Sequence, residues 1–163
     1  MGDVPHTSES RIPLGGLLDA ALEAVLAEFR RDLAEAGYGD IRPTHGCVFR
    51  FVRGDGMRLT ELAELAGMTK QSVGEVVDDL GALGYVERVP DPLDGRAKLI
   101  RLTDRGAEAQ RVGFGLFAEL EARWAERFGP ERFAELREIL EEIVAAEAPE
   151  KVPELARREL AAA

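Results

Sequence analysis

Gly67 separates two short segments whose apolar residues recur at helical spacing. Ala63 lies four residues before this glycine, and Val73 lies six residues after it. Two helices that cross at a sharp turn need a small residue at the crossing, a residue tolerant of positive φ at the turn, and an apolar residue that returns the second helix to the first. The pattern favours a helix-turn-helix, in which we predict that Thr60 caps the first helix and Thr69 the second.

A hairpin is predicted directly after this pair of helices. Residues 85–89 and 97–102 favour β structure, and Pro92, Asp94 and Gly95 between them are turn residues. The full order of elements is helix, helix, short helix, turn, helix, hairpin and long helix. This order is typical of a winged helix-turn-helix, so we predict a mainly α fold with a small β-hairpin, flanked by N-terminal and C-terminal dimerisation helices.

The chain divides into one domain and two ends. We predict a disordered tail at 1–12, a single domain at 13–147 and a helical extension at 148–163, with the winged helix-turn-helix at about 40–104 and dimerisation helices at about 13–36 and 104–147. These flanking helices carry more apolar surface than a small winged helix can cover. Exposed stripes of that kind usually find a partner, so we expect a two-fold homodimer.

Composition limits the remaining functions. A net charge of -10 argues against non-specific coating of a polyanion, but DNA binding depends on the local field of the contacting face. The start has no signal-peptide pattern, and no apolar run approaches the roughly 20 residues that span a bilayer. We therefore expect a cytoplasmic protein with no membrane partner. No nucleophile–base pair, phosphate loop or metal-ligand spacing is present, so we expect no enzyme activity, no cofactor and no metal site.

Cys47 is the only cysteine in the sequence, which excludes an internal disulfide and a cysteine-rich metal site. It stands a few residues into a predicted helix, where a helix N-terminus can lower a thiol pKa. A free cysteine is more often a small buried apolar residue. We therefore expect a structural role and keep redox sensing as the alternative.

Three stretches, at residues 59–73, 83–86 and 91–106, carry a resemblance to a known family. The chain resembles the multiple antibiotic resistance regulator (MarR) family from about residue 14 to residue 144. The Asp-x-Arg of the family's wing stands here as Asp94-Gly95-Arg96, and its Leu-Thr-x-x-Gly runs from Leu102 to Gly106. The resemblance implies a homodimeric transcription factor, predicted here to be a repressor of a pseudo-palindromic operator. Its recognition helices enter successive major grooves of double-stranded DNA, and its wings reach the minor groove.

The hairpin supplies the first group of predicted DNA contacts. A basic tip can enter a narrow minor groove, where the negative potential is concentrated. Arg96 suits this because its guanidinium is planar, always charged and weakly hydrated. Lys98 lies close by, and Asp94 is expected to orient the tip by pairing with Arg96 or with a nearby backbone N–H. The alternative is a solvated hairpin with a surface salt bridge of little consequence.

The start of the second helix supplies the next group. Gln71 can pair with adenine, Lys70 with guanine or phosphate, and Glu75 can accept a hydrogen bond from cytosine N4. Thr69 and Ser72 are candidates for phosphate, supported by the helix N-terminus. The alternative for each residue is a cap or an exposed surface position.

Two further arginines, Arg58 and Arg88, are candidates for phosphate contacts. Against DNA binding, Glu75, Asp78 and Asp79 make the middle of the recognition helix acidic. Three interpretations stay open: this section lies away from phosphate, the protein binds DNA weakly but selectively, or the winged helix is a protein-interaction module that has lost DNA binding.

The resemblance also implies a small aromatic or phenolic effector, bound where the dimerisation helices meet the DNA-binding lobe. The residues that could line such a site are Tyr38, His45, Phe49, Phe51 and Trp124. The alternative is that these aromatic side chains belong to the core.

Overall fold

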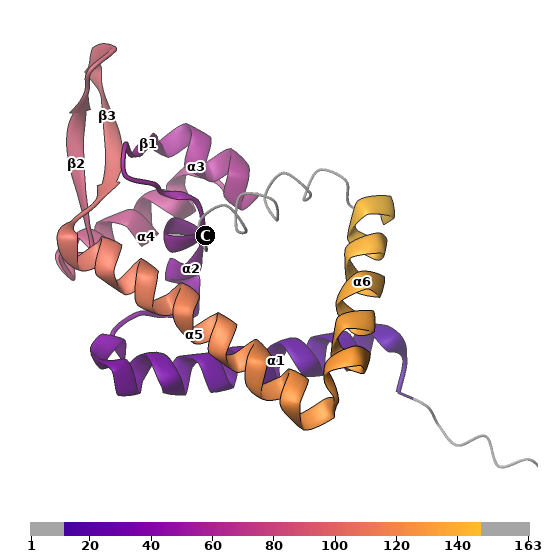
Figure 1. The fold of residues 1–163 in the computed structure, drawn as a ribbon. Coiled ribbons are helices and arrows are strands. Elements are labelled where there is room, and N and C mark those ends of the chain that lie inside the picture. The colour runs from indigo at the N-terminus through magenta and orange to yellow at the C-terminus, as the bar shows by residue number, and fades with distance from the viewer. Residues whose placement is uncertain (1–11, 148–163) are drawn as a thin grey trace, which may run out of the picture.

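The computed structural model describes residues 12–147, which form a helical protein with one small antiparallel sheet (Figure 1). The prediction of a mainly α fold with a winged helix-turn-helix is confirmed. The predicted tail at 1–12, apart from its last residue, and the predicted extension at 148–163 lie outside the described residues. Within the described range, no helix has both the length and the apolar character needed to cross a membrane.

The described helices are α1 (Leu14–Leu33), α2 (Gly46–Phe51), α3 (Leu59–Ala66), α4 (Lys70–Ala82), α5 (Asp104–Phe128) and α6 (Pro130–Glu147). Two short helical turns, η1 (Ala34–Tyr38) and η2 (Pro43–His45), connect α1 to α2. The strands are β1 (Met57–Arg58), β2 (Val86–Asp91) and β3 (Asp94–Leu102), arranged in the antiparallel order β1-β3-β2. The β2–β3 hairpin projects from the lobe that α3 and α4 form, while α6 stands at the opposite end of α5 (Figure 1).

The turn between α3 and α4 confirms the predicted helix-turn-helix. Gly67 has a φ of 63° and ends α3 in the left-handed conformation, which a residue with a Cβ rarely adopts. Ala63 is 6% exposed and Val73 is fully buried, so both pack where the helices cross. The residues of the lobe core are Val48, Phe51, Val52, Leu62, Ala63, Val73, Val77, Leu80, Tyr85, Val86, Ile100 and Ala109.

One predicted cap is confirmed and the other is wrong. The Thr69 hydroxyl accepts the Ser72 backbone N–H at 3.1 Å and caps α4 as expected. Thr60 does not cap α3, because that helix already begins at Leu59. The residue before it, Arg58, is still extended and pairs with strand β3, so β1 runs directly into the helix without a side-chain cap.

Helix α1 packs on α5 through apolar and charged contacts. The rings of Phe29 and Phe117 stack with their centroids 3.9 Å apart. Arg123 donates hydrogen bonds to Glu28 and Asp32, and Trp124 Nε1 donates to the same Glu28 at 3.1 Å. The Arg123 hydrogen bond is the main reason that the pKa of Glu28 lies below its usual value. These contacts join the two helices firmly.

Large apolar side chains nevertheless remain exposed on the flanking helices. The members of this flanking stripe are Ile12, Leu14, Leu17, Leu18, Leu22, Phe128, Leu136, Ile139 and Ile143. Gly129, which has a φ of 97°, ends α5, and Pro130 begins α6. The single chain therefore leaves uncovered much of the apolar surface that the sequence analysis assigned to a partner.

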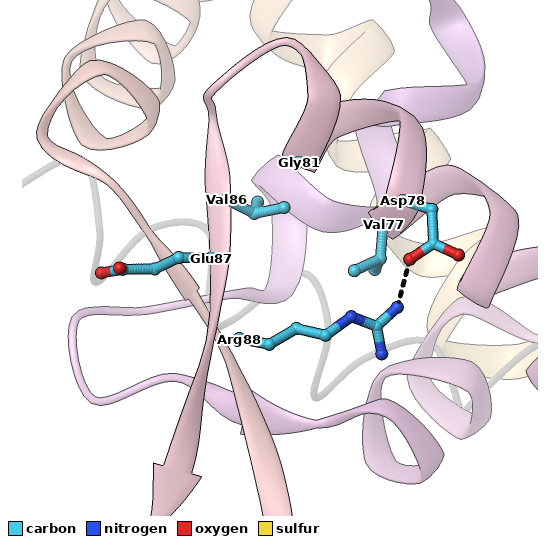
Figure 2. A pocket seen from close by; sticks show the side chains of 6 residues that line it. All are labelled: Val77, Asp78, Gly81, Val86, Glu87 and Arg88. Atoms are coloured by element: carbon cyan, nitrogen blue, oxygen red, sulfur yellow. Dashed lines mark hydrogen bonds and ion pairs between the residues drawn. The ribbon is translucent and has the colours of Figure 1, made fainter.

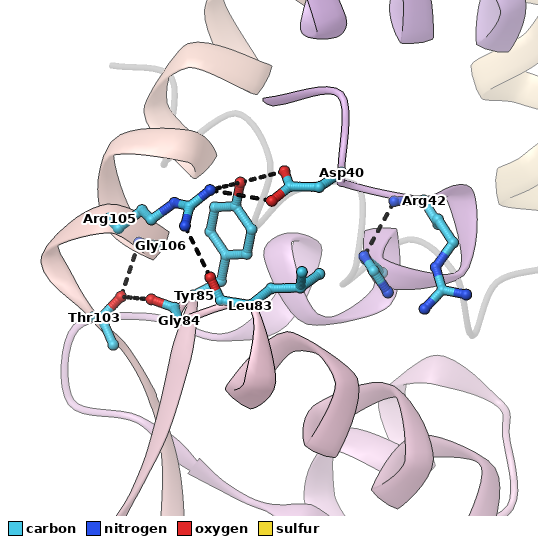
Figure 3. Close-up of polar contacts among 9 residues, drawn as sticks. Asp40, Arg42, Leu83, Gly84, Tyr85, Thr103, Arg105 and Gly106 are labelled. Atoms are coloured by element: carbon cyan, nitrogen blue, oxygen red, sulfur yellow. Dashed lines mark hydrogen bonds and ion pairs between the residues drawn. The ribbon is translucent and has the colours of Figure 1, made fainter. Parts of the chain in front are cut away.

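The start of α5 is locked onto the base of the hairpin (Figure 3). The Thr103 hydroxyl donates to the Gly84 carbonyl at 2.7 Å and accepts the Gly106 backbone N–H at 3.1 Å. The Thr103 backbone N–H donates to the Tyr85 carbonyl at 3.0 Å. The Leu-Thr-x-x-Gly motif is thus a helix cap whose cap residue also holds Gly84 and Tyr85, the two residues directly before β2.

Arg105 completes this junction. Its guanidinium donates to the Leu83 carbonyl at 3.0 Å, to Asp40 at 3.1 Å and to the Tyr85 hydroxyl at 3.0 Å (Figure 3). The Tyr85 hydroxyl in turn donates to Asp40 at 2.6 Å. Burial, reinforced by the Asp40 carboxylate, raises the pKa of Tyr85 to about 12. The hairpin, the α5 helix and the segment after η1 therefore meet at one buried phenol.

Candidate DNA-binding site

The start of α4 presents polar side chains on a capped helix. Lys70 and Gln71 are exposed, and Gln71 Nε2 donates to the Glu75 carboxylate one turn later at 3.3 Å. The hydroxyls of Thr69 and Ser72 are 2.8 Å apart and bonded to each other. The cap and the Gln71–Glu75 pair both restrict the side chains that would have to meet base edges or phosphates.

The wing is tighter than the sequence predicted. Strand β3 already begins at Asp94, so the apex consists of Pro92 and Leu93 alone. The Asp94 carboxylate accepts the backbone N–H of Arg96 at 3.1 Å, and this is the backbone alternative of the two predicted roles. The side chains of Arg96 and Lys98 are exposed and, two residues apart on one strand, lie on the same face.

Arg58 holds the wing instead of presenting a free charge. Its Nε and Nη2 atoms donate to the Asp91 carboxylate at 2.8 and 2.5 Å, and Nη2 lies 3.7 Å from Asp94. Asp91 is 6% exposed, and its other oxygen accepts the Leu93 backbone N–H at 2.8 Å. The Leu93 N–H and then the Arg58 guanidinium hold the pKa of Asp91 below its usual range. A phosphate contact by Arg58 would have to compete with this pair.

Arg88 is paired in a similar way. Its guanidinium donates to Asp78 of α4 at 2.5 Å, across a hollow of about 320 Å³ between α4 and β2 (Figure 2). Val77 and Val86 line the apolar side of this hollow, whereas the Glu87 side chain points to the other side of the strand (Figure 2). The predicted role of Arg88 as a phosphate ligand therefore competes with its role as the partner of Asp78.

Asp79 faces the neighbouring turn. It accepts hydrogen bonds from Arg42 and from Nε2 of His45, the latter at 2.6 Å. Nδ1 of His45 accepts the Arg42 backbone N–H at 3.1 Å, so the neutral ring carries its proton on Nε2. The His45 hydrogen bond, with help from Arg42, keeps the pKa of Asp79 below its usual value. Two of the three acidic residues in the middle of α4, Asp78 and Asp79, are therefore bonded to side chains from elsewhere in the chain.

Three exposed cations of the winged lobe lie where the sequence analysis placed DNA contacts. Among the described residues, no hydrogen bond or ion pair engages the side chains of Lys70, Arg96 or Lys98. Lys70 stands at the start of α4, and the other two stand on the wing. The structure therefore brings the predicted contacts together on the lobe formed by α3, α4 and the hairpin.

The five candidate ligand-binding residues do not gather at one place within the chain. Phe51 and His45 are 5% and 1% exposed, Phe49 meets the Tyr85 ring edge-on at 5.8 Å, and Tyr38 lies 6.4 Å from that ring. Trp124 instead packs edge-on against Phe128 near the far end of α5. Phe51 therefore belongs to the core, as the alternative in the sequence analysis held, and His45 is a structural partner of Asp79.

The surroundings of Cys47 agree with the structural role that the sequence analysis expected. Its thiol is half-buried, lies 3.4 Å from the Thr44 carbonyl, and burial raises its pKa. A raised thiol pKa leaves less of the reactive thiolate at neutral pH. Within residues 12–147, no group of three or more His, Cys, Asp or Glu side chains is placed to hold a metal ion.

Sequence reasoning missed Asp91 and Arg42. Asp91 had a usable signal, because an Asp directly before Pro at the start of a turn often accepts a backbone N–H two residues later. The side chain of Arg42 gave none, since its partner Asp79 is 37 residues away in the sequence.

A helix-turn-helix with an adjoining hairpin, basic at the helix start and on the hairpin, defines a winged helix-turn-helix protein. The family profile of the MarR family matches residues 40–97. The chain belongs to the MarR family, whose members are transcription regulators and not enzymes.

Solved structures support the assignment. The transcriptional regulator PA4135 is 30% identical, with 84% of this chain and 99% of that chain covered and a TM-score of 0.63. The transcriptional repressor CouR, solved bound to a 23-mer DNA duplex, is 25% identical over 81% of this chain and 92% of that chain, with a TM-score of 0.67. MarR of E. coli in its apo form shares the fold at 24% identity, covering 82% of this chain and 98% of that chain, with a TM-score of 0.66. No curated protein matches the sequence.

Proposed function

We propose that this protein is a cytoplasmic, homodimeric transcriptional repressor that binds a pseudo-palindromic operator in double-stranded DNA. Helix α4 enters the major groove with Lys70 and Gln71 at its leading end. The wing reaches the adjacent minor groove with Arg96, and Lys98 contacts the backbone. The repressor CouR, which has a similar fold and was solved on a DNA duplex, supports this arrangement.

The observation that carries the proposal is the sorting of charges on the winged lobe. Arg58, Arg88 and Arg42 are each bonded to a carboxylate, whereas Lys70, Arg96 and Lys98 are exposed at the start of α4 and on the wing. An acidic protein can bind DNA when its free cations lie on the contacting face and its acids are paired behind them.

The acidic middle of α4 is compatible with DNA binding on these contacts. Asp79 turns to Arg42 and His45, and Asp78 is bonded to Arg88. Glu75 stays exposed and orients Gln71. This favours the interpretation in which the acidic section lies away from phosphate. The protein-interaction module is kept as the alternative, because Asp78 remains 71% exposed in its side chain and would repel a phosphate nearby.

The homodimer rests on the flanking stripe. Leucine and isoleucine side chains of α1 and α6 are 43% to 65% exposed in the single chain. A two-fold dimer that buries them sets two copies of α4 about 34 Å apart, which is one turn of DNA. An aromatic effector bound between the dimerisation helices and the winged lobe would change this spacing and release the operator. Tyr38 and Phe49, which lie near the Tyr85 ring, are the proposed contacts; Trp124 packs on Phe128 at the far end of α5 and is not among them.

The test begins with selection from a random duplex pool, followed by anisotropy titrations of the enriched duplex at several salt concentrations. We expect a pseudo-palindrome and a steep fall of affinity with salt, because phosphate contacts release counterions. Arg96→Ala should weaken binding by about tenfold or more. It should also reduce the slope of the logarithm of the binding constant against the logarithm of the salt concentration by about one. Arg101→Ala is the matched control, since Arg101 lies on the other face of β3 and pairs with Glu87 at 2.8 Å.

Equal losses for Arg96→Ala and Arg101→Ala would contradict the assignment of the wing. If wild type enriches no duplex at low salt, with and without added small aromatic acids, the protein-interaction module becomes the better description.

A further inference from the structure

The apex of the wing presents a leucine to solvent. Leu93 is 94% exposed, more than any other large apolar side chain in the described part of the chain. Hairpin apices usually carry Asn, Asp or Gly, which bond to the turn or accept positive φ, and leucine does neither. A single exposed leucine is ordinary on a protein surface, so exposure alone decides nothing. The contacts that fix the position of Leu93 are the informative feature.

A buried carboxylate directly beneath the apex fixes the position of Leu93. Asp91 is 6% exposed and accepts three hydrogen bonds, from the Leu93 backbone N–H and from two nitrogen atoms of Arg58. A buried carboxylate is costly unless it is well paired, and these three hydrogen bonds pair it. We call Asp91 and Arg58 the wing clamp. Because the clamp orders the apex in the free protein, a partner does not have to supply that ordering.

The backbone of the apex is also unusual. Pro92 restricts φ to about −65°, and among the described residues only glycines have positive φ. The turn is therefore not one of the primed types that match the twist of a hairpin. The pairing of β2 with β3 shifts register between Pro90 and Asp91, which accommodates the mismatch. Pro92 and Leu93 thus occupy an apex at which Asn-Gly would fit the twist of the strands better.

The surroundings of Leu93 indicate which partner it meets. Arg96 and Lys98 are exposed on β3, so the projecting end of the hairpin combines an apolar apex with cationic flanks. Proteins that bind the minor groove use this combination: the cation responds to the negative potential, and the apolar side chain enters a base step and partly unstacks it.

We propose that Leu93 is an apolar wedge that enters the minor groove of the operator at a flexible pyrimidine–purine step, with the wing clamp as its positioning group. The proposal rests on the DNA-binding function proposed above and adds a source of sequence selectivity to it. Such steps are easily kinked, so the wedge selects for deformability and not for base edges. It also supplies affinity that does not depend on counterion release, which suits a chain with a net charge of -10.

The experiment uses the enriched duplex with 2-aminopurine in place of adenine at the pyrimidine–purine steps that a hydroxyl-radical footprint assigns to the wing. Unstacking increases 2-aminopurine emission. Wild type should raise the emission at one such step in each half-site. Leu93→Ala should abolish this rise and weaken binding by about tenfold with an unchanged salt slope. Leu93→Met, which keeps the apolar volume, should retain both the emission and the affinity.

A second variant, Arg58→Met, tests the wing clamp separately from Leu93. Arg58→Met leaves Leu93 in place but removes two of the hydrogen bonds to Asp91. It should lower the emission rise while the circular dichroism spectrum stays that of wild type.

The outcomes separate the two proposals. If wild type binds the duplex with a steep salt slope and Leu93→Ala keeps both affinity and emission, the wedge is refuted and DNA binding stands. If wild type binds no duplex, both proposals fail.

Discussion

At the scale of single residues, Gly106 shows how close packing and helix capping can depend on the same residue. A Cβ built at this position would lie 1.9 Å from the Tyr85 carbonyl oxygen, far inside van der Waals contact. The glycine lets the first turn of α5 approach Tyr85, the residue directly before β2. Its backbone N–H also bonds to the Thr103 cap. The glycine of the Leu-Thr-x-x-Gly motif is therefore required by the distance between two elements and not by a positive φ.

We predict that Gly106→Ala destabilises the protein by about 3 kcal/mol or more, because the added methyl group must push α5 away from a backbone atom. Urea unfolding at a fixed protein concentration measures the change. Gly115→Ala is the matched control: it lies in the same helix, and its Cβ would meet nothing within 4 Å. The control should be neutral or stabilising by up to about 1 kcal/mol, since alanine favours helix. Similar losses in both variants would point to helix propensity and refute the packing argument.

At the scale of elements, the junction around Tyr85 couples the wing to the long helix. The strand, α5 and the segment after η1 each contribute a group to the phenol or to its partners Asp40 and Arg105. The Arg105 guanidinium also lies 4.4 Å from the centre of the Tyr85 ring. A shift of α5 would therefore be transmitted to the base of the hairpin, and this is the connection that a change in dimer geometry would use.

We predict that Tyr85→Phe lowers the free energy of unfolding by about 1 kcal/mol at neutral pH, since it leaves Asp40 and Arg105 each without one partner. The pKa of Tyr85 is raised to about 12 in the folded protein, so folding favours the neutral phenol. Its contribution is complete below the unfolded pKa of about 10 and is lost as the pH rises towards 12. Urea unfolding of both proteins from pH 7 to 11 should show the difference shrinking above pH 10.

Tyr38→Phe is the control for this experiment. Tyr38 is the other of the two tyrosines, and within the described residues its hydroxyl makes no hydrogen bond. This variant should cost little at neutral pH. A Tyr85→Phe difference that stays constant through pH 11 would contradict the role of the phenol proton.

Elements with local sequence signals were predictable, whereas contacts between distant parts of the chain were not. Helical periodicity predicted the long helices, and Gly67 and Thr69 predicted the helix-turn-helix, because these signals act within one or two turns of chain. The two-residue strand β1 has no periodicity to detect, and missing it produced the wrong cap at Thr60. The pairs Arg58–Asp91 and Arg42–Asp79 join residues 33 and 37 positions apart, so only the fold could bring them together.

At the scale of the whole molecule, charge and apolar surface are separated. The winged lobe carries free cations on the wing and at the start of α4, while Asp91, Asp78 and Asp79 are paired with arginines. The flanking stripe runs over α1 with the residue Ile12 before it, the end of α5, and α6. A chain organised this way has one surface suited to a polyanion and another suited to a second copy. Under the proposed function each half-site would meet few cations, so the proposed dimer would be needed for a useful operator affinity.

We predict that Leu17→Glu converts the dimer to a monomer, because a carboxylate would be buried in an apolar interface without a partner. Several kcal/mol of desolvation correspond to a dissociation constant raised by about 100-fold or more. Leu17 is 50% exposed in the single chain, so the fold of each copy should survive. Leu93→Glu is the matched control for association only: its leucine is 94% exposed but stands on the wing, so the variant should remain dimeric. Sedimentation equilibrium measures the association, and operator affinity should fall with it, since two linked half-sites gain about 10²- to 10⁴-fold over one. A dimeric Leu17→Glu would show that this part of α1 lies outside the interface.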